Sequence, residues 1–172
     1  MKRTLLLFAF LCATIAASAQ SPASGYRSYV DLGHSFATQT NEYYDTSESH
    51  IDVSTSHGYS YKGLFYVGGG VGLTSMYSWG FEILALPVFA DLRAYAPTKG
   101  AVKPYLGLRT GVSCGLTLVI GGPTMGVGFY LNPSLGIEID RVDISLSYVQ
   151  QEHCAYNMGE GIMLRIGYRF GK

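Results

Sequence analysis

Charged residues are scarce in this sequence. Asp, Glu, Lys and Arg make up 14% of its 172 residues, whereas soluble globular domains contain roughly 25%. So few charges are poorly suited to covering the surface of a water-soluble domain of this length. The 12 basic residues are balanced by 12 acidic ones, which excludes the strongly basic surface of a nucleic-acid-binding protein.

The sequence also offers no segment suited to a transmembrane helix after its first 20 residues. Residues 110–137 carry no charge, but Gly121, Gly122 and Pro123 interrupt the middle of this stretch. Because glycine and proline break helices, the stretch is expected to form two strands around a turn. Glycine (22 residues) and tyrosine (14 residues) are abundant instead.

The first residues predict export from the cytoplasm. Lys2 and Arg3 form a basic region, residues 5–15 are apolar, and an Ala-Ser-Ala sequence ends at Ala19. This order is typical of a secretory signal peptide that is cleaved before Gln20. We therefore expect a signal peptide at residues 1–19, exported by the Sec pathway, and one domain at residues 20–172.

Period-two alternation of apolar and polar residues runs through the rest of the chain. In the last such segment, every second residue from Ile162 to Phe170 is apolar. Successive side chains of a strand point to opposite sides, so this pattern indicates strands and no helix explains it. Eight segments follow the pattern: residues 26–37, 50–59, 63–75, 80–95, 103–114, 125–139, 142–149 and 162–170. The expected fold is all-β, an eight-stranded antiparallel up-and-down transmembrane β-barrel.

The polar faces of these strands decide which side is expected to be inside. They carry glycine and serine with only one or two charges each, too few for a face in contact with water. Turned inward, the small residues fit a narrow lumen, where acidic and basic side chains can pair and plug the barrel. The expected lumen charge cluster is Asp31, Asp91, Arg93, Arg109, Glu138, Asp143, Arg165 and Arg169. Pairing of the first and last strands should bring Asp31 within reach of Arg165 or Arg169.

The connections and the rims support this topology. Tight turns are expected at residues 60–62 and 140–141 and longer outer loops at residues 38–49, 115–124 and 151–159, with a short outer loop at residues 76–79. The outer end is expected to carry carboxylates without a basic residue: Glu42, Asp45, Glu48, Asp52, Glu82, Glu152 and Glu160. Aromatic residues are expected at both rims, where the membrane interface favours them: Tyr59, Tyr61, Phe65, Tyr105, Tyr168 and Phe170 at one end, and Phe36, Tyr77, Trp79 and Phe81 at the other.

The whole segment after the signal peptide resembles small outer-membrane β-barrel proteins of the OmpA-like and OmpX-like type. Tyr168 and Phe170 are similar to the C-terminal Tyr-x-Phe signal that the barrel-assembly machinery reads in that family, although Gly171 and Lys172 follow them here. The resemblance implies no shared catalytic residues.

Candidate chemical sites are few. Cys114 and Cys154 are both expected at the outer end, where an oxidising compartment permits a disulfide, but two unpaired thiols remain an alternative. The four histidines show no metal-ligand spacing, so neither a metal nor a cofactor is expected. His34 and Ser35, like Ser56 and His57, are adjacent on a strand and point to opposite faces, which argues against a nucleophile and base.

The leading functional interpretation is a non-enzymatic outer-membrane barrel, with a structural or surface-interaction role in the cell envelope. The expected partners are outer-membrane lipids, lipopolysaccharide and the barrel-assembly machinery, and the expected state is a monomer that binds no nucleic acid. A lipid-modifying outer-membrane enzyme and a periplasmic carrier of lipids or small molecules are the alternatives. The carrier would have an apolar lumen, so the orientation of the two faces separates it from the other two.

Overall fold

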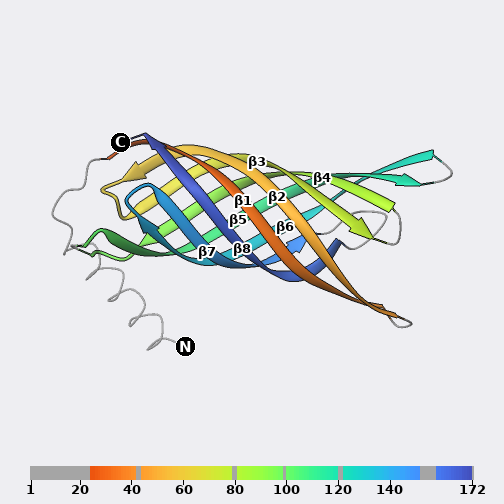
Figure 1. The fold of residues 1–172 in the computed structure, drawn as a ribbon. Coiled ribbons are helices and arrows are strands. Elements are labelled where there is room, and N and C mark those ends of the chain that lie inside the picture. Colours follow the sequence, from red (N-terminus) through yellow and green to blue (C-terminus); the bar gives the residue numbers. More distant parts are fainter. Residues whose placement is uncertain are drawn as a thin grey trace, which may run out of the picture.

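The computed structural model describes residues 24–41, 44–78, 81–98, 100–119, 122–151 and 158–171. Within this part of the chain, eight strands form one closed barrel (Figure 1). The strands are β1 (Gly25–Asn41), β2 (Tyr44–Tyr61), β3 (Phe65–Ser78), β4 (Phe81–Tyr95), β5 (Val102–Val119), β6 (Gly122–Ile139), β7 (Val142–Gln151) and β8 (Met158–Gly171). The expected signal peptide lies outside the described residues. No helix among the described residues is long and apolar enough to cross a membrane.

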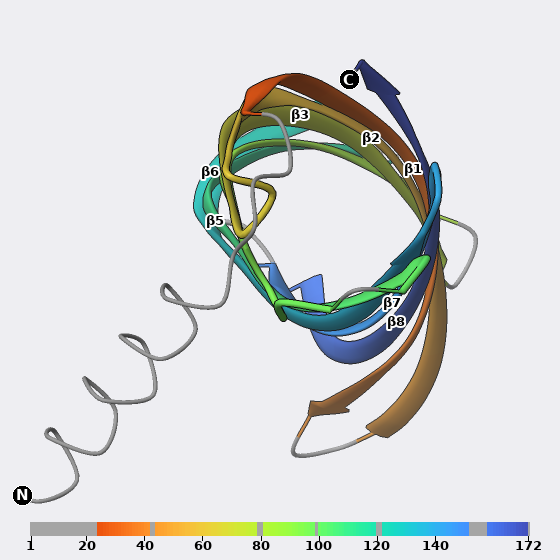
Figure 2. The ribbon, with the colours of Figure 1, turned by 90° about the vertical axis from the view of Figure 1, so that its left-hand side faces the viewer.

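Each strand pairs in antiparallel fashion with the next along the chain, and β8 pairs with β1 to close the barrel. The closing register runs from Arg27 opposite Gly171 to Thr38 opposite Glu160. Looking along the barrel, Figure 2 shows the strands as a continuous wall around the lumen. The predicted up-and-down eight-stranded barrel, with its first and last strands paired, is confirmed.

The two ends of the barrel differ. At the end where β1 begins and β8 ends, here called the terminal end, residues 62–64 and 140–141 make tight turns. Lys62 (φ 50°), Gly63 (φ 61°) and Asp140 (φ 54°) adopt the left-handed conformation that such turns require. At the opposite end, here called the hairpin end, the β1–β2 and β5–β6 hairpins extend beyond the barrel body (Figure 1).

These two hairpins correct the sequence interpretation. Residues 38–49 and 115–124 were expected to be long loops, but β1 continues to Asn41, β2 starts at Tyr44, β5 reaches Val119 and β6 starts at Gly122. Backbone pairing extends out to the hairpin tips. The polar composition of residues 38–49 and the glycine and proline within residues 115–124 suggested loops. However, threonine recurs in both segments, and β-branched residues favour strands.

Burial alternates along the strands with period two. In β7 the pattern is exposed and buried in strict alternation from Val142 to Val149. The outward residues are largely Leu, Ile, Val and aromatic residues, whereas Asp, Arg, Ser and Tyr dominate the buried positions. The barrel therefore has an apolar outer wall and a polar, charged core.

Candidate functional site

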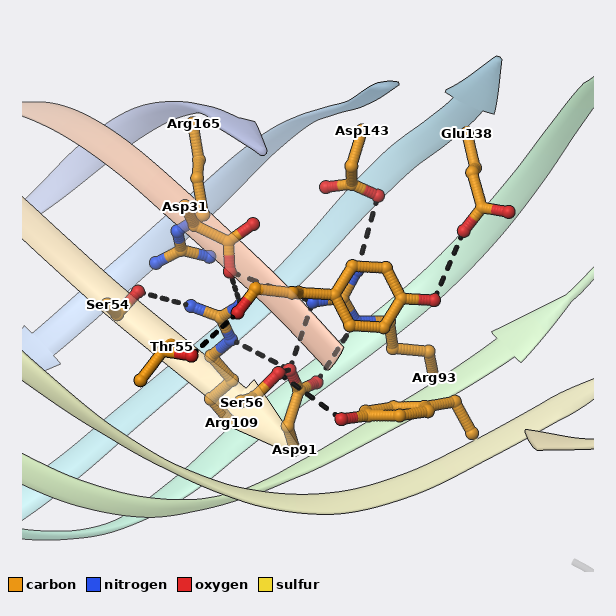
Figure 3. Close-up of polar contacts among 12 residues, drawn as sticks. Asp31, Ser54, Thr55, Ser56, Asp91, Arg93, Arg109, Glu138, Asp143 and Arg165 are labelled. Atoms are coloured by element: carbon orange, nitrogen blue, oxygen red, sulfur yellow. Dashed lines mark hydrogen bonds and ion pairs between the residues drawn. The ribbon is translucent and has the colours of Figure 1, made fainter. Parts of the chain in front are cut away.

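The structure places all eight residues of the expected lumen charge cluster on the inward side of the barrel wall. Seven are at least 96% buried, and the Arg169 side chain is 11% exposed. The residues come from six of the eight strands, because each strand contributes every second side chain to the lumen. Figure 3 shows how seven of them converge with hydroxyl side chains between the strands.

Arg93 on β4 is the centre of this cluster. Its guanidinium lies 3.0 Å from the Asp91 carboxylate, 3.2 Å from that of Asp143 and 3.9 Å from that of Asp31. It also lies over the Tyr29 ring, 3.8 Å from the centroid. Arg93 thus links three carboxylates of three different strands, and such charge-assisted hydrogen bonds are stronger than neutral ones.

Arg109 on β5 forms the second centre. Its guanidinium lies 2.5 Å from the Asp31 carboxylate and 3.3 Å from that of Asp91, and it donates a hydrogen bond of 3.1 Å to the Ser54 hydroxyl. In an eight-stranded barrel, β1 and β5 lie on opposite sides, so the Asp31–Arg109 pair connects opposite walls. The interior of such a barrel is just wide enough for side chains to meet in this way.

Tyrosine side chains complete the network towards the terminal end. The hydroxyls of Tyr29 and Tyr95 each donate a hydrogen bond of 3.2 Å to Glu138, whose other oxygen lies 3.2 Å from Arg169. The Tyr105 hydroxyl donates to Asp143 over 2.8 Å. Tyr105 was expected at the aromatic rim, and this was wrong. It alternates with the outward Leu106 and shares the inward face of Arg109. Strict alternation of inward and outward residues along β5 would therefore have placed Tyr105 in the lumen.

Arg165 differs from the other arginines of the cluster. It was expected to meet Asp31, but the structure pairs Asp31 with Arg109 instead. Arg165 donates to the Asn132 side-chain oxygen (3.3 Å) and to the Met163 sulfur (3.1 Å). Among the described residues no carboxylate lies within ion-pair distance of it. The expectation failed because it assumed contact between neighbouring strands, whereas long inward side chains reach across the lumen.

Asp52 also corrects the sequence interpretation. It was expected among the outer carboxylates, but it is 1% exposed and faces the lumen. It accepts hydrogen bonds from Ser54 (3.3 Å) and Thr74 (3.1 Å). Within the described part of the chain, the lumen therefore holds five arginines and five carboxylates: Arg27, Arg93, Arg109, Arg165, Arg169, Asp31, Asp52, Asp91, Glu138 and Asp143. Equal numbers of opposite charges make a neutral plug.

Three polar side chains, those of Tyr26, His57 and Thr55, form a chain of hydrogen bonds on the outer wall. The Tyr26 hydroxyl is 2.6 Å from His57 Nδ1, His57 Nε2 is 3.2 Å from the Thr55 hydroxyl, and that hydroxyl donates over 2.9 Å to the Tyr29 carbonyl oxygen. This is the described arrangement most similar to a nucleophile–base pair. However, the Thr55 proton is directed to the backbone rather than to His57, and a base-activated nucleophile requires the reverse. The chain of hydrogen bonds satisfies these polar groups on a largely apolar wall.

Three of the remaining candidate residues, Cys114, Tyr168 and Phe170, lie on the outer surface. Cys114 is exposed, and Cys154 lies outside the described residues, so their disulfide stays a prediction. Tyr168 and Phe170 are exposed at the terminal end with their rings in edge-to-face contact. The Tyr168 hydroxyl hydrogen-bonds to Arg141 in the turn and so raises the pKa of Arg141. No group of three or more potential metal ligands comes together among the residues that the structure describes.

Comparison with known proteins gives the fold a context. No family model and no curated sequence matches the chain, but several solved structures do. Neisserial surface protein A is 17% identical, with a TM-score of 0.59 over 86% of this chain and 98% of that protein. Ail of Yersinia pestis, solved in complex with the heparin analogue sucrose octasulfate, is 16% identical, with a TM-score of 0.52 over 84% and 99%. The outer membrane enzyme PagL is 11% identical, with a TM-score of 0.52 over 84% and 99%.

At sequence identities this low, the structural match shows a shared fold and nothing more. The chain has the architecture of small eight-stranded outer-membrane β-barrels, as the sequence resemblance implied. The same fold serves an enzyme, a surface protein and an attachment invasion locus protein, so function has to be argued from the residues.

Proposed function

We propose that this chain is a non-enzymatic outer-membrane β-barrel protein with a structural or surface-interaction role in the envelope of a Gram-negative bacterium. One observation carries the proposal: the barrel is charged inside and apolar outside. An apolar wall that surrounds a closed, fully paired sheet is suited to hydrocarbon, where every backbone polar group must be satisfied internally. The same observation contradicts the carrier alternative, since the described part of the chain fills the lumen with charged and polar side chains instead of lining it with apolar ones.

The filled interior favours a structural or interaction role over transport. Ion pairs and tyrosine hydroxyls connect opposite walls through the centre of the lumen, as the Asp31–Arg109 and Tyr29–Glu138 contacts illustrate. Barrels need about sixteen strands before a wide aqueous channel remains. The plug holds the barrel in one shape, which suits a rigid support for the two hairpins that extend from it.

Export and assembly follow the route expected from the sequence. Residues 1–19 would direct the chain through the Sec pathway and be removed before Gln20. The exposed aromatic rings of Tyr168 and Phe170 would be available to the barrel-assembly machinery on the final strand. The mature barrel would be a monomer, with its terminal end in the periplasm and its hairpin end outside, in contact with lipopolysaccharide.

The surface partner is expected to differ from the ligand in the Ail structure. By sequence, the hairpin end carries Glu42, Asp45, Glu48 and Glu152 without a lysine or arginine. Such a surface repels a polysulfate like sucrose octasulfate. We propose that it instead favours neutral or cationic partners, or contacts lipopolysaccharide phosphates through divalent cations, whose preferred ligands are oxygen atoms.

Expression in a Gram-negative host with the native signal peptide tests the proposal. The protein should fractionate with the outer membrane and migrate faster on gels before heating than after it. Phospholipids and lipid A of these cells should show the same masses as those of cells without the protein. A new lipid species that disappears with His57→Gln would overturn the non-enzymatic assignment, and recovery of a folded barrel in the soluble periplasm would overturn the membrane assignment.

A further inference from the structure

A groove in the outer wall is the strongest feature that the lumen network does not explain. It lies across β3, β4 and β5 towards the terminal end and has a volume of about 360 Å³. That volume falls within the range of ligand pockets, roughly 300–1,000 Å³. Six outward side chains line it: Phe65, Val67, Leu92, Ala94, Leu106 and Leu108.

The groove arises from one small side chain between two large ones. Ala94 on β4 pairs with Phe65 on β3 and with Leu106 on β5. Since the two large residues stand on either side of the methyl group, Ala94 forms a floor between two walls. Leu92 and Leu108 continue the apolar lining one step along the strands. A linear hydrocarbon chain lying along β4 would be contacted on three sides.

A positive charge lies at the same end of the barrel as the groove. Lys62 is exposed in the turn that precedes β3, three residues before Phe65 in the chain. Its ammonium group lies 5.2 Å from the centroid of the Tyr61 ring, and Tyr61 pairs with Phe65 across β2 and β3. Tyr61, with Lys62 over its ring, therefore lies on the other side of Phe65 from Ala94. A cation and a tyrosine one strand away from an apolar groove match a lipid that joins a phosphate to a hydrocarbon chain.

We propose that the groove is a binding site for one phospholipid of the inner leaflet of the outer membrane. One acyl chain occupies the channel over Ala94, and the phosphate lies at Lys62. The inference rests on the proposed membrane location, with the terminal end in the periplasm. Bulk lipid touches every part of the wall, so preference for this site comes from closer van der Waals packing in the groove and from the charge of Lys62.

Two alanines of β4 give a matched pair of variants. Ala94 and Ala90 both face outward, but only Ala94 lines the groove. The full mature barrel, as wild type and as Ala94→Phe and Ala90→Phe, is inserted into vesicles of equal parts phosphatidylglycerol and phosphatidylethanolamine. It is then extracted in mild detergent, and bound phospholipid is counted by native mass spectrometry. Ala94→Leu and Ala90→Leu serve if a phenylalanine variant does not fold.

The wild type and Ala90→Phe should each retain one phospholipid, whereas Ala94→Phe should lose about tenfold in the retained fraction. Phosphatidylglycerol should be retained over phosphatidylethanolamine by about fivefold, and Lys62→Gln should abolish that preference while one lipid remains bound. Equal retention by the Ala94 and Ala90 variants, or no retention by the wild type, overturns the site. Failure of every variant to insert into the vesicles would instead count against the membrane location.

Discussion

Arg93 is expected to be the arginine on which the barrel depends most, and Arg165 the one that it can lose. The relevant perturbation is Arg→Met at each position, which removes the charge and keeps an unbranched apolar side chain in the lumen. Both arginines are at least 96% buried, so burial alone does not distinguish them. The contacts of their guanidinium groups do.

The structure sets the expected magnitudes. Arg93 contacts the carboxylates of Asp91, Asp143 and Asp31. Asp91 and Asp31 keep Arg109 when Arg93 is removed, but Asp143 is left with the Tyr105 hydroxyl. Removing one partner of a buried ion pair costs about 3–5 kcal/mol of unfolding free energy.

Arg165 is expected to behave differently because its bonds go to neutral groups, Asn132 and Met163. A lost hydrogen bond to a charged group costs about 1.5–3 kcal/mol, but here the cost of burying an arginine without a carboxylate partner is relieved at the same time. We therefore expect Arg165→Met to lower the free energy of unfolding by less than about 2 kcal/mol.

Urea titration of the refolded barrel in micelles, with the folded fraction measured by gel mobility without heating, compares the two variants. The double variant Arg93→Met, Asp143→Asn should recover part of the loss, about 0.5–3 kcal/mol, because it removes the carboxylate left without its cation. Equal losses for Arg93→Met and Arg165→Met, or no recovery in the double variant, would refute the assignment of Arg93 as the centre of the network.

Three further predictions concern other parts of the barrel. Gly111→Ala should cost about 1–3 kcal/mol in the same urea assay, since a Cβ there would collide with the backbone oxygen of Val88 on β4. Gly69→Ala, with 3.8 Å of clearance, should be tolerated; equal effects would contradict this. Cys114 and Cys154 should resist alkylation in protein from the outer membrane until a reductant is added, and immediate labelling of both would show two free thiols. Phe170→Ser should reduce the amount of assembled barrel in cells while refolding in detergent stays near wild type; a parallel loss in both would mean that the ring stabilises the barrel instead.

Period-two alternation predicted the faces of the strands, because the direction of a side chain depends only on whether its position along the strand is odd or even. That is why Asp91, Arg93 and Arg109 could be placed inside before any geometry was known. Tyr105 and Asp52 were assigned to an end of the barrel without regard to this alternation, and for both the prediction was wrong.

Partners inside the lumen and the lengths of the hairpins could not be predicted in the same way. Which charges meet depends on the tilt and stagger of the strands and on the reach of arginine across the barrel, as Asp31 and Arg109 show. The strand ends lie in polar or glycine-rich segments where composition suggests a loop, although the backbone can continue to pair there. The alternation of inward and outward residues carries no information about which charges pair or where the hairpins end.

In a membrane-spanning barrel the outer wall faces hydrocarbon. A single nitroxide label measures the surroundings of this wall directly. The label is placed at Leu86, Val112 or Leu164, which all face outward near the middle of their strands. Cys114 and Cys154 are replaced by serine, and the labelled barrel is inserted into phospholipid vesicles. We expect strong relaxation by oxygen and weak relaxation by a water-soluble nickel complex at these three positions, and the reverse for a label at Arg141 in the turn. Strong relaxation by the nickel complex at Leu86, Val112 and Leu164 would show that this wall faces water and that the barrel does not span a membrane.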